Sequence, residues 1–589
     1  MPVSTDQALP RQPRRGLGAS TTLAAGNQPA AGGTLRQIVA PGWEPVVAEL
    51  VSRLRGGGLA DEGPRGAFIV KQGQHRTVYR LAIAGQSLIV KHYPCSHWRG
   101  RLKHLVRGST ARREWHKTLA AAERGIDTIE LVACLEQYTW GLCGDSYLVS
   151  RELPAAQPLD LYLAELAQRE TLPHQPSDRR RIIDQLARFT AAVHRAGILH
   201  DDFHAGNILW QQNEQAAAPS RLVLIDLPGA RLGAPLDWRH TRRGLAMLAT
   251  SLGGIAQGTD IIRFFMYYLR ERPDLRLDHR AGLLQLEQHT RSHAQRILRG
   301  RDGRSLRTNR DFRAIKSKAG RAHAIHDFPT SHIAQLLEDP DRPLRDFRHA
   351  PVKLSRTSMV MAAELPAETG NIRVAFKRSR NAIWWKAMLG RFRRSRAVEA
   401  FRRGHALLQR GIATPRPLLA LESACASRSG DSHLAVEWID GAENLHLFGW
   451  RLAELAPSHR RRLTRQAAAS LGRLVGRMHN QQVAHRDLKG TNLIFVEQPG
   501  GVDALIVDLD GMSICRRLTP EERAANLARL AVAVAAHPWV SRTDHLRLLT
   551  AYLQQLPADQ RHLKQLWKKV AARTQPVRNR LHQQGKPLA

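Results

Sequence analysis

Two kinds of hydrophobic pattern alternate along the chain, and they predict which segments form strands and which form helices. The runs SLIVKHY (87–93) and NIRVAFKRS (371–379) are short and rich in β-branched residues, so they predict strands. The segments REWHKTLAAAERG (113–125) and VEAFRRGHALLQRG (398–411) carry apolar residues every three or four positions and end at a glycine, so they predict helices. The same order of strand and helix therefore occurs twice.

An internal repeat decides the domain organisation. The motif HDDFHAGNIL (200–209) aligns with HRDLKGTNLI (485–494), and behind them LVLIDLPGA (222–230) aligns with LIVDLDGM (505–512). Amphipathic helical sequence leads into each motif, and mostly helical sequence follows it. The pattern predicts two copies of one domain, each with a mixed lobe followed by a helical lobe.

Composition sets the domain boundaries that we expect. Residues 1–40 are rich in Ala, Gly, Pro and Gln without apolar periodicity, which predicts a disordered tail. Residues 301–349 contain basic sequence and the Asp- and Pro-rich LEDPDRPLRD, which indicates a basic linker or an extension of the next domain. The first domain then spans 41–300 and the second spans 350–589. The predicted fold class is α+β, with two tandem domains that each have a small β-rich N-lobe and a larger helical C-lobe.

Candidate chemistry is clearest in the second copy, where HRDLKGTN has the form of the catalytic loop of protein-kinase-like phosphotransferases. In such a loop the aspartate, here Asp487, orients the attacking hydroxyl, and the asparagine, here Asn492, binds a metal ion. Asp508 follows an apolar strand just behind the loop and suits a second metal ligand. Upstream, Lys377 ends a V-A-F-K strand and suits the lysine that pairs with ATP phosphates, and helical Glu399 is expected to hold it.

The first copy carries the same ordered set. Its five members are Lys91, Glu114, Asp202, Asn207 and Asp226. Each residue alone is weak evidence, because an aspartate after a strand is often a turn residue and a helical glutamate usually faces solvent. The order of all five, and a lysine-to-aspartate spacing that agrees to within one residue between the copies, favour phosphoryl transfer with ATP and Mg2+ as cofactors.

On these motifs the chain resembles the lipopolysaccharide kinase family of Gram-negative bacteria, within the protein-kinase-like superfamily. The shared features are a Gly-poor nucleotide loop, the RREW start of the helix with Glu114, the HxDxHxxN form of the first loop, and Asp-Leu in place of Asp-Phe-Gly in both copies. The resemblance implies an ATP- and Mg2+-dependent kinase of heptose or Kdo hydroxyls in the lipopolysaccharide inner core. It also implies a lipid-linked core sugar as substrate and a cytoplasmic enzyme, peripheral at the inner face of the cytoplasmic membrane.

Three departures from the kinase pattern affect the expected nucleotide contacts. Neither copy has a GxGxxG loop, since residues 70–81 contain one glycine and residues 352–365 contain none. The first catalytic loop has His204 where the second has Lys489, and Pro228 follows the first Asp-Leu pair. We therefore expect a differently built phosphate loop and two copies that are not interchangeable.

The net charge of +37, from 89 Lys and Arg against 52 Asp and Glu, indicates an anionic partner. We expect this partner to be an anionic inner-membrane surface, with a merely solvated charge excess as the alternative. A candidate contact is an aromatic and basic cluster just before Glu399, for which ordinary N-lobe packing is the alternative. Its members are Trp384, Trp385, Lys386, Arg391, Arg393, Arg394 and Arg396.

Other classes of protein are excluded or kept as alternatives. Five cysteines without CxxC pairs argue against a disulfide framework or a zinc site, and the chain has no apolar run long enough to span a bilayer. His200 and His204 around Asp202 suit a metal site, but the loop alignment explains them without one. A kinase of proteins or other small molecules and a regulatory pseudokinase scaffold stay open. Nucleic-acid binding has only the charge in its favour and is not expected.

Overall fold

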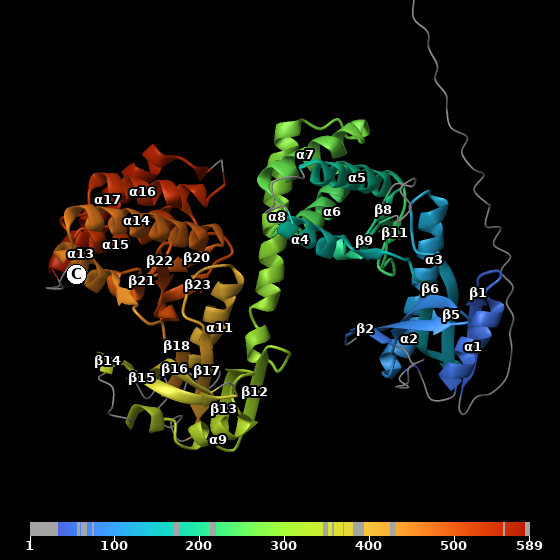
Figure 1. The fold of residues 1–589 in the computed structure, drawn as a ribbon, viewed down its shortest axis with the longest axis horizontal. Coiled ribbons are helices and arrows are strands. Elements are labelled where there is room, and N and C mark those ends of the chain that lie inside the picture. The colour runs from blue at the N-terminus through green and yellow to red at the C-terminus, as the bar shows by residue number, and fades with distance from the viewer. Residues whose placement is uncertain are drawn as a thin grey trace, which may run out of the picture. The chain divides into compact units, whose positions relative to one another are not determined.

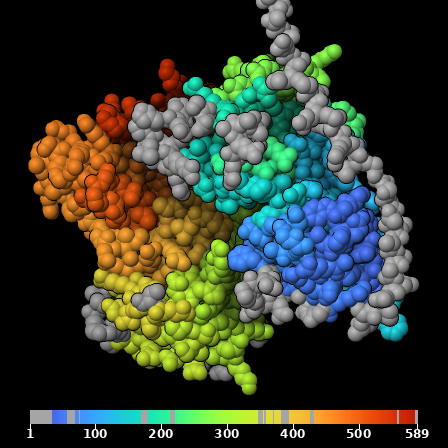
Figure 2. Space-filling view, turned by 45° about the vertical axis from the view of Figure 1, so that its right-hand side comes forward, coloured from blue at the N-terminus to red at the C-terminus, as the bar shows by residue number. Residues whose placement is uncertain are grey.

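The computed structural model forms two compact units, one within residues 1–294 and one within residues 295–589 (Figure 1). Each unit contains an antiparallel sheet followed in sequence by a mostly helical part. In Figure 2 the blue, sheet-bearing part of the first unit lies against its cyan helical part. The structure describes residues 33–55, 59, 68–73, 76–169, 176–212, 220–345, 351–355, 358–368, 370–380, 394–424, 431–557 and 560–583.

The first sheet has six antiparallel strands in the order β1-β5-β6-β4-β3-β2. Its strands are β1 (Thr34–Val39), β2 (Phe68–Gln72), β3 (Thr77–Ile83), β4 (Gln86–Tyr93), β5 (Leu131–Thr139) and β6 (Leu142–Arg151). The helices of this part are α1 (Glu44–Arg55), α2 (Trp98–Arg107) and α3 (Thr110–Glu123). Helix α3 places Trp115 in a core with Leu131 and Leu148 of the sheet, so the sheet fixes the position of this helix.

Strand β1 corrects the predicted tail of residues 1–40. It pairs antiparallel with β5 from Thr34 opposite Tyr138 to Val39 opposite Ala133. The segment TLRQIV has β-branched and apolar residues, and it covers the edge of β5 that would otherwise leave unpaired backbone groups. Residues 1–32 of the predicted tail lie outside the described residues.

The second sheet has seven antiparallel strands in the order β12-β13-β17-β18-β16-β15-β14. Its strands are β12 (Phe312–Ser317), β13 (Gly320–Ile325), β14 (Pro351–Leu354), β15 (Ser358–Ala367), β16 (Gly370–Ser379), β17 (Pro417–Ser423) and β18 (Ser432–Glu437). Helices α9 (Thr330–Glu338) and α11 (Arg396–Gln409) accompany it. Within the range 301–349, β12 and β13 belong to this sheet, because β13 pairs with β17. The second unit consequently starts before the expected residue 350.

The helical parts repeat the same succession of short strands and helices. In the first unit the elements are β7 (Ala156–Pro158), α4 (Leu159–Arg169), α5 (Pro176–Arg195), β8 (Ile198–Leu199), η1 (Ala205–Asn207), β9 (Ile208–Gln211), β10 (Arg221–Leu224), β11 (Arg231–Leu232), α6 (Trp238–Ser251), α7 (Gly258–Arg270), η2 (Pro273–Leu275) and the start of α8 (His279–Arg301). The residues of α8 from Gln295 onward belong to the second unit. In the second unit they are β19 (Glu443–Asn444), α13 (Leu445–Glu454), α14 (Pro457–Asn480), β20 (Val483–His485), η6 (Gly490–Asn492), β21 (Leu493–Gln498), β22 (Gly501–Ile506), η7 (Leu509–Gly511), β23 (Met512–Ile514), α15 (Pro520–Val534), α16 (Arg542–Gln554) and α17 (Leu563–Gln583). Short helices η3 (Arg304–Leu306) and η4 (Arg342–Arg345) complete the described elements.

A buried histidine–tyrosine pair recurs in both helical parts and predicts acid sensitivity. His194 Nδ1 lies 2.9 Å from the Tyr268 hydroxyl, and His479 Nδ1 lies 2.8 Å from the Tyr552 hydroxyl. Burial lowers the pKa of each histidine to about 3. The unfolded chain then binds more protons than the folded chain below pH 6.5, so stability falls as the pH drops from there toward 3. At pH 5 the loss amounts to about 2 kcal/mol for each histidine.

Calorimetric unfolding between pH 7 and pH 5 tests this expectation. The unfolding transition of each unit should move to lower temperature on acidification, and His194→Gln or His479→Gln should flatten the pH dependence of the unit that carries it. Glutamine is neutral across this range, so it removes the proton uptake. An unchanged pH dependence in both variants would show that these histidines do not cause the acid sensitivity.

Candidate active sites

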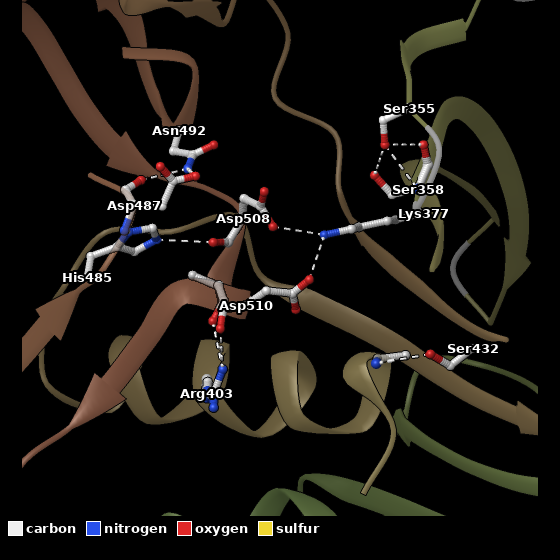
Figure 3. A network of polar contacts seen from close by, with 12 residues as sticks. Ser355, Ser358, Lys377, Arg403, Ser432, His485, Asp487, Asn492, Asp508 and Asp510 are labelled. Carbon is white, nitrogen blue, oxygen red and sulfur yellow. Dashed lines mark hydrogen bonds and ion pairs between the residues drawn. The ribbon is translucent and has the colours of Figure 1, made fainter. Parts of the chain in front are cut away.

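Each candidate catalytic loop is held in place by a histidine at its start. In the first unit His200 Nδ1 accepts a hydrogen bond from the Asp202 backbone N–H at 3.1 Å, and its Nε2 donates to the Ile225 carbonyl at 3.2 Å. His485 Nδ1 likewise accepts from the Asp487 N–H, and its Nε2 donates to the carbonyl of Asp508, both at 3.1 Å (Figure 3). The imidazole thus joins the loop to the segment behind it.

Both nitrogens of these histidines are used for structure, which argues against the metal site considered for His200 and His204. Burial lowers the pKa of His200 and of His485, so each ring stays neutral. Across the described part of the chain, no group of three or more His, Cys, Asp or Glu side chains is arranged to hold a metal ion. A kinase magnesium site does not need such a group, because Mg2+ takes one or two carboxylates together with substrate phosphates and water.

The loop asparagines are each held by a hydrogen bond within their own loop. Asn207 Nδ2 donates to the Asp202 carbonyl at 2.9 Å, and Asn492 Nδ2 donates to the Asp487 carbonyl at 2.8 Å. These bonds fix the amide so that its oxygen faces away from the loop. Within the described residues, Asn492 Oδ1 is buried without a hydrogen-bond partner. A buried, unpaired oxygen is costly unless a ligand satisfies it, so the arrangement fits a hard cation such as Mg2+.

The second pair of candidate metal ligands shares an uncommon backbone conformation. Asp226 follows β10 with a φ of 69°, and Asp508 follows β22 with a φ of 58°. Few residues other than glycine adopt the left-handed region, and doing so costs of the order of 1 kcal/mol or more. Such strain is kept where the surrounding structure requires one side-chain direction. The same strain at the same place in both units supports a shared functional requirement for this carboxylate.

In the first unit the predicted lysine and glutamate are paired. Lys91 on β4 lies with its Nζ 2.6 Å from Glu114 Oε1 and 3.4 Å from Asp226 Oδ1. Glu114 on α3 is fully buried, and the hydroxyl of Tyr93 donates to its second oxygen. Burial and the negative charge of Glu114 raise the pKa of Tyr93, so the phenol stays a donor. The structure therefore brings together Lys91, Glu114 and Asp226 as expected.

Arg76 is a site residue that the motif search missed. It directly precedes β3, and its guanidinium forms an ion pair with Asp226. Burial raises the pKa of Asp226, but Lys91 and Arg76 outweigh this effect and lower the pKa to about 2. Arg76 belongs to the Gly-poor segment 70–81, so the signal that could have found it was a cation where a glycine loop was expected.

In the second unit the predicted pair of Lys377 and Glu399 is wrong. Lys377 Nζ lies 2.9 Å from Asp508 Oδ1 and 3.5 Å from Asp510 Oδ2 (Figure 3). Glu399 instead binds Arg402 at 2.5 Å and Arg403 at 3.1 Å. Burial raises the pKa of Glu399, but these arginines outweigh burial and lower it. The charge of Glu399 is thus neutralised by its own helix.

The physical reason is the position of each glutamate relative to the start of its helix. The side chain of Ser109 caps α3 and that of Ser395 caps α11. Glu114 lies five positions after its cap, whereas Glu399 lies four positions after its cap. One residue turns the side-chain direction by about 100° around the helix axis. The position equivalent to Glu114 is occupied by the buried Ala400.

A second pair of contacts supports this alignment. Lys117 and Arg403 each lie eight positions after the cap serine. Lys117 Nζ donates to the Pro228 carbonyl at 2.8 Å, and Arg403 Nη1 donates to the Asp510 carbonyl at 3.0 Å. Pro228 and Asp510 are therefore equivalent positions, each two residues after the strained aspartate. In the sequence, the first unit has DLPG where the second has DLDG, and this difference could have identified Asp510 as an extra carboxylate near Lys377.

The candidate catalytic aspartates are exposed and have different neighbours. Asp202 Oδ2 lies 3.4 Å from His204 Nε2, and the hydrogen bond of His204 lowers the pKa of Asp202. Asp487 Oδ2 lies 2.8 Å from Lys489 Nζ. The side chain beside the candidate catalytic aspartate is therefore an imidazole in one loop and an ammonium in the other.

The structure describes only part of the aromatic and basic cluster that was predicted to contact a membrane. Residues 381–393 of the aromatic and basic cluster lie outside the described residues, which leaves Arg394 and Arg396. Arg394 lies 3.9 Å from Glu399. Arg410, at the end of α11, does not face a membrane, because it forms a buried ion pair with Asp302 at 2.6 Å. No helix among the described residues is both long and apolar enough to cross a membrane.

Comparisons with known proteins agree with the repeat. The model of the lipopolysaccharide kinase (Kdo/WaaP) family matches residues 70–268 and again residues 366–575. The lipopolysaccharide core heptose(I) kinase WaaP of Pseudomonas aeruginosa is 28% identical over 224 residues, which are 37% of this chain and 82% of that protein.

The solved structures that match include the following two. WaaP in complex with acyl carrier protein is 24% identical with a TM-score of 0.33, over 43% of this chain and 98% of that one. WbdD is 17% identical with a TM-score of 0.24, over 37% of this chain and 44% of that one. The family match alone includes more than half of the chain and covers both candidate sites. The predicted family is confirmed: the chain belongs to the lipopolysaccharide kinase (Kdo/WaaP) family.

Proposed function

We propose that this chain transfers the γ-phosphate of ATP to heptose or Kdo hydroxyls of the lipopolysaccharide inner core, with one kinase-like site in each unit. The observation that carries the proposal is the repetition of one constellation in a member of this family. Each unit has a loop aspartate, a loop asparagine, a strained aspartate behind them and a strand lysine. The relative that is a heptose(I) kinase supports a core sugar as acceptor.

The proposed roles follow from the position of each group. Asp202 and Asp487 are exposed at the loop, so they can accept the proton of an incoming sugar hydroxyl. Asn207 with Asp226, and Asn492 with Asp508, supply oxygen ligands for Mg2+. Mg2+ bound there supplies positive charge that neutralises the phosphates during transfer. The remaining contribution of the protein is to hold these groups in place.

The lysines Lys91 and Lys377 are proposed to bind the ATP phosphates, and each needs an acid that holds its ammonium in place. In the first unit Glu114 does this from the helix. In the second unit we assign the role to Asp510, because Glu399 is occupied by Arg402 and Arg403. In each unit the lysine thus lies beside two carboxylates. One is the strained aspartate, and the other comes from helix α3 in the first unit and from the Asp-Leu-Asp segment in the second.

The differences between the loops support different acceptor hydroxyls for the two units. His204 and Lys489 flank the proton acceptor, where a sugar would enter. The alternatives have less support. A regulatory pseudokinase scaffold does not require the complete constellation twice, and the matched family is described as a lipopolysaccharide kinase family, not as a family of kinases for proteins or other small molecules. The acceptor is lipid-linked, so we place the enzyme at the cytoplasmic face of the inner membrane, with an anionic surface as partner.

A transfer assay with a defined acceptor tests the proposal. Purified protein, labelled ATP and Mg2+ are incubated with core lipopolysaccharide that lacks its core phosphates, and in parallel with a generic protein acceptor. We expect label on heptose or Kdo of the lipopolysaccharide. Label on protein alone would show that the chain is a protein kinase, and binding of ATP without any transfer would show a scaffold.

A further inference from the structure

Helix α2 (Trp98–Arg107) of the first unit has its apolar side turned to solvent. Trp98 is 65% exposed, Leu102 is 45% exposed and Leu105 is 58% exposed. These residues are four and seven positions apart and form one stripe along the helix. No residue of α2 is buried. A surface helix normally packs such a stripe against the core, so the orientation of α2 is reversed.

The opposite side of α2 explains how this orientation is held. Gly100, Arg101 and His104 are the half-buried residues of the helix. His104 Nδ1 lies 3.3 Å from the carbonyl oxygen of Cys143 on β6. At Gly100 a Cβ atom would lie 2.7 Å from the sulfur of Cys95, so only glycine allows this approach. Small and polar residues therefore dock the helix, and the apolar stripe is left outside.

Basic residues lie along the border of the apolar stripe. Arg99, Lys103 and Arg107 are exposed, and residues 94–109 contain no acidic side chain. A basic hollow adjoins the end of the helix, and Glu136 is the one acidic residue among those that line it. Its basic lining residues are Arg36, His104, Arg107, Arg112, Arg113 and His116.

Trp140 adds a second aromatic group near α2. It is 95% exposed at the turn between β5 and β6. Its neighbour Gly141 lines the same hollow as Leu105 of the helix. Tryptophan next to aliphatic residues and a row of cations is the composition that suits the interface between lipid headgroups and acyl chains.

The sequence repeats this chemistry in the second copy. Residues 380–395 separate the lysine strand from the next helix, as residues 94–109 do in the first copy, and the two segments have equal length. Trp384 stands at the position of Trp98, and the segment again contains basic but no acidic residues. Residues 381–393 are outside the described part of the chain, so the parallel is one of sequence. Both copies therefore have a basic segment with a tryptophan between the lysine strand and the helix that follows it.

We propose that α2 is an anchor that lies in the headgroup layer of an anionic membrane. Its apolar stripe enters the interface, and Arg99, Lys103 and Arg107 bind the anionic headgroups. A second copy of the chain is a poor occupant, because a two-fold contact through this face would bring the two basic rows together. The inference extends the proposed function, since it names the surface that brings the first unit to a lipid-linked acceptor.

Binding of the full-length protein to vesicles tests the anchor. We expect binding to vesicles of phosphatidylcholine with one third phosphatidylglycerol, weaker binding at higher salt, and little binding to phosphatidylcholine alone. The double change Leu102→Gln and Leu105→Gln should lower the affinity for the anionic vesicles by about tenfold or more, because two apolar side chains no longer enter the interface. The matched control is Ile262→Gln with Leu284→Gln, two exposed apolar residues elsewhere in the first unit, which should leave binding unchanged.

The readouts separate this inference from the kinase proposal. Turnover of ATP in solution should be the same in the α2 variant and in the wild type, because α2 contributes no group to the site. Unchanged vesicle binding in the α2 variant, or equal binding to neutral vesicles, would overturn the anchor even if transfer to lipopolysaccharide is observed. A loss of self-association in the variant with no loss of vesicle binding would also overturn it and assign the face to contact between copies.

Discussion

Replacing both loop aspartates, Asp202→Asn with Asp487→Asn, should lower the rate of phosphate transfer by about 10²- to 10⁴-fold, the contribution typical of a positioned proton acceptor. Asparagine has the shape of aspartate but neither accepts the proton nor carries the charge. Each single variant should remove only the activity of its own unit. Initial rates with core lipopolysaccharide as acceptor give the measurement.

Two controls make this result interpretable. Both aspartates are exposed, so thermal unfolding of the variants should match that of the wild type. The change Asp503→Asn removes an exposed aspartate from β22 of the second unit and should leave the rate unchanged. If the double variant transfers phosphate at the wild-type rate, the assignment of the catalytic aspartates is wrong.

The second large effect is expected at Asp510. In protein whose first unit is silenced by Asp202→Asn, Asp510→Asn should lower kcat/KM for ATP by about 10- to 100-fold, as expected for loss of a partner to a largely buried charge. Burial lowers the pKa of Lys377, and Asp510 and Asp508 together raise it above its usual value. Without Asp510 the ammonium keeps Asp508 as its partner and is less firmly positioned.

The matched variants on the two helices distinguish this account from the usual lysine–glutamate pair. Glu399→Gln in the same background should change kcat/KM by less than about threefold, because Glu399 contacts arginines of its own helix. Glu114→Gln, tested with the second unit silenced by Asp487→Asn, should cost as much as Asp510→Asn does. A large loss from Glu399→Gln together with no loss from Asp510→Asn would restore the helix glutamate to the role predicted from sequence.

The elements and motifs that sequence alone predicted are those that local pattern determines. The strand expected at 87–93 corresponds to β4, and the helix expected at 398–411 corresponds to α11, because hydrophobic periodicity follows directly from burial of one face. The constellation around Lys91 was also predictable, because its members belong to motifs with fixed order in the chain.

What sequence did not predict depends on tertiary contacts or on a single residue of register. Strand β1 and the β12–β13 hairpin gain their structure by pairing with β5 and β17, which their own composition does not reveal. The error at Glu399 came from matching a residue type near the expected place without counting from the cap at Ser395. Arg76 was missed because the kinase motifs used for the prediction contain no cation in the nucleotide loop, and its ion pair with Asp226 joins residues 150 positions apart in the chain.

The central claim is that two kinase-like sites act on different hydroxyls of the lipopolysaccharide core, and mass spectrometry of the core made in cells tests it most directly. Strains that express the chain with Asp202→Ala or Asp487→Ala, and no other copy of the gene, are compared with the wild type. The account predicts that each strain lacks one phosphate and that the two missing phosphates lie at different sugar positions. Loss of the same phosphate in both strains, or a wild-type core in both, would contradict it.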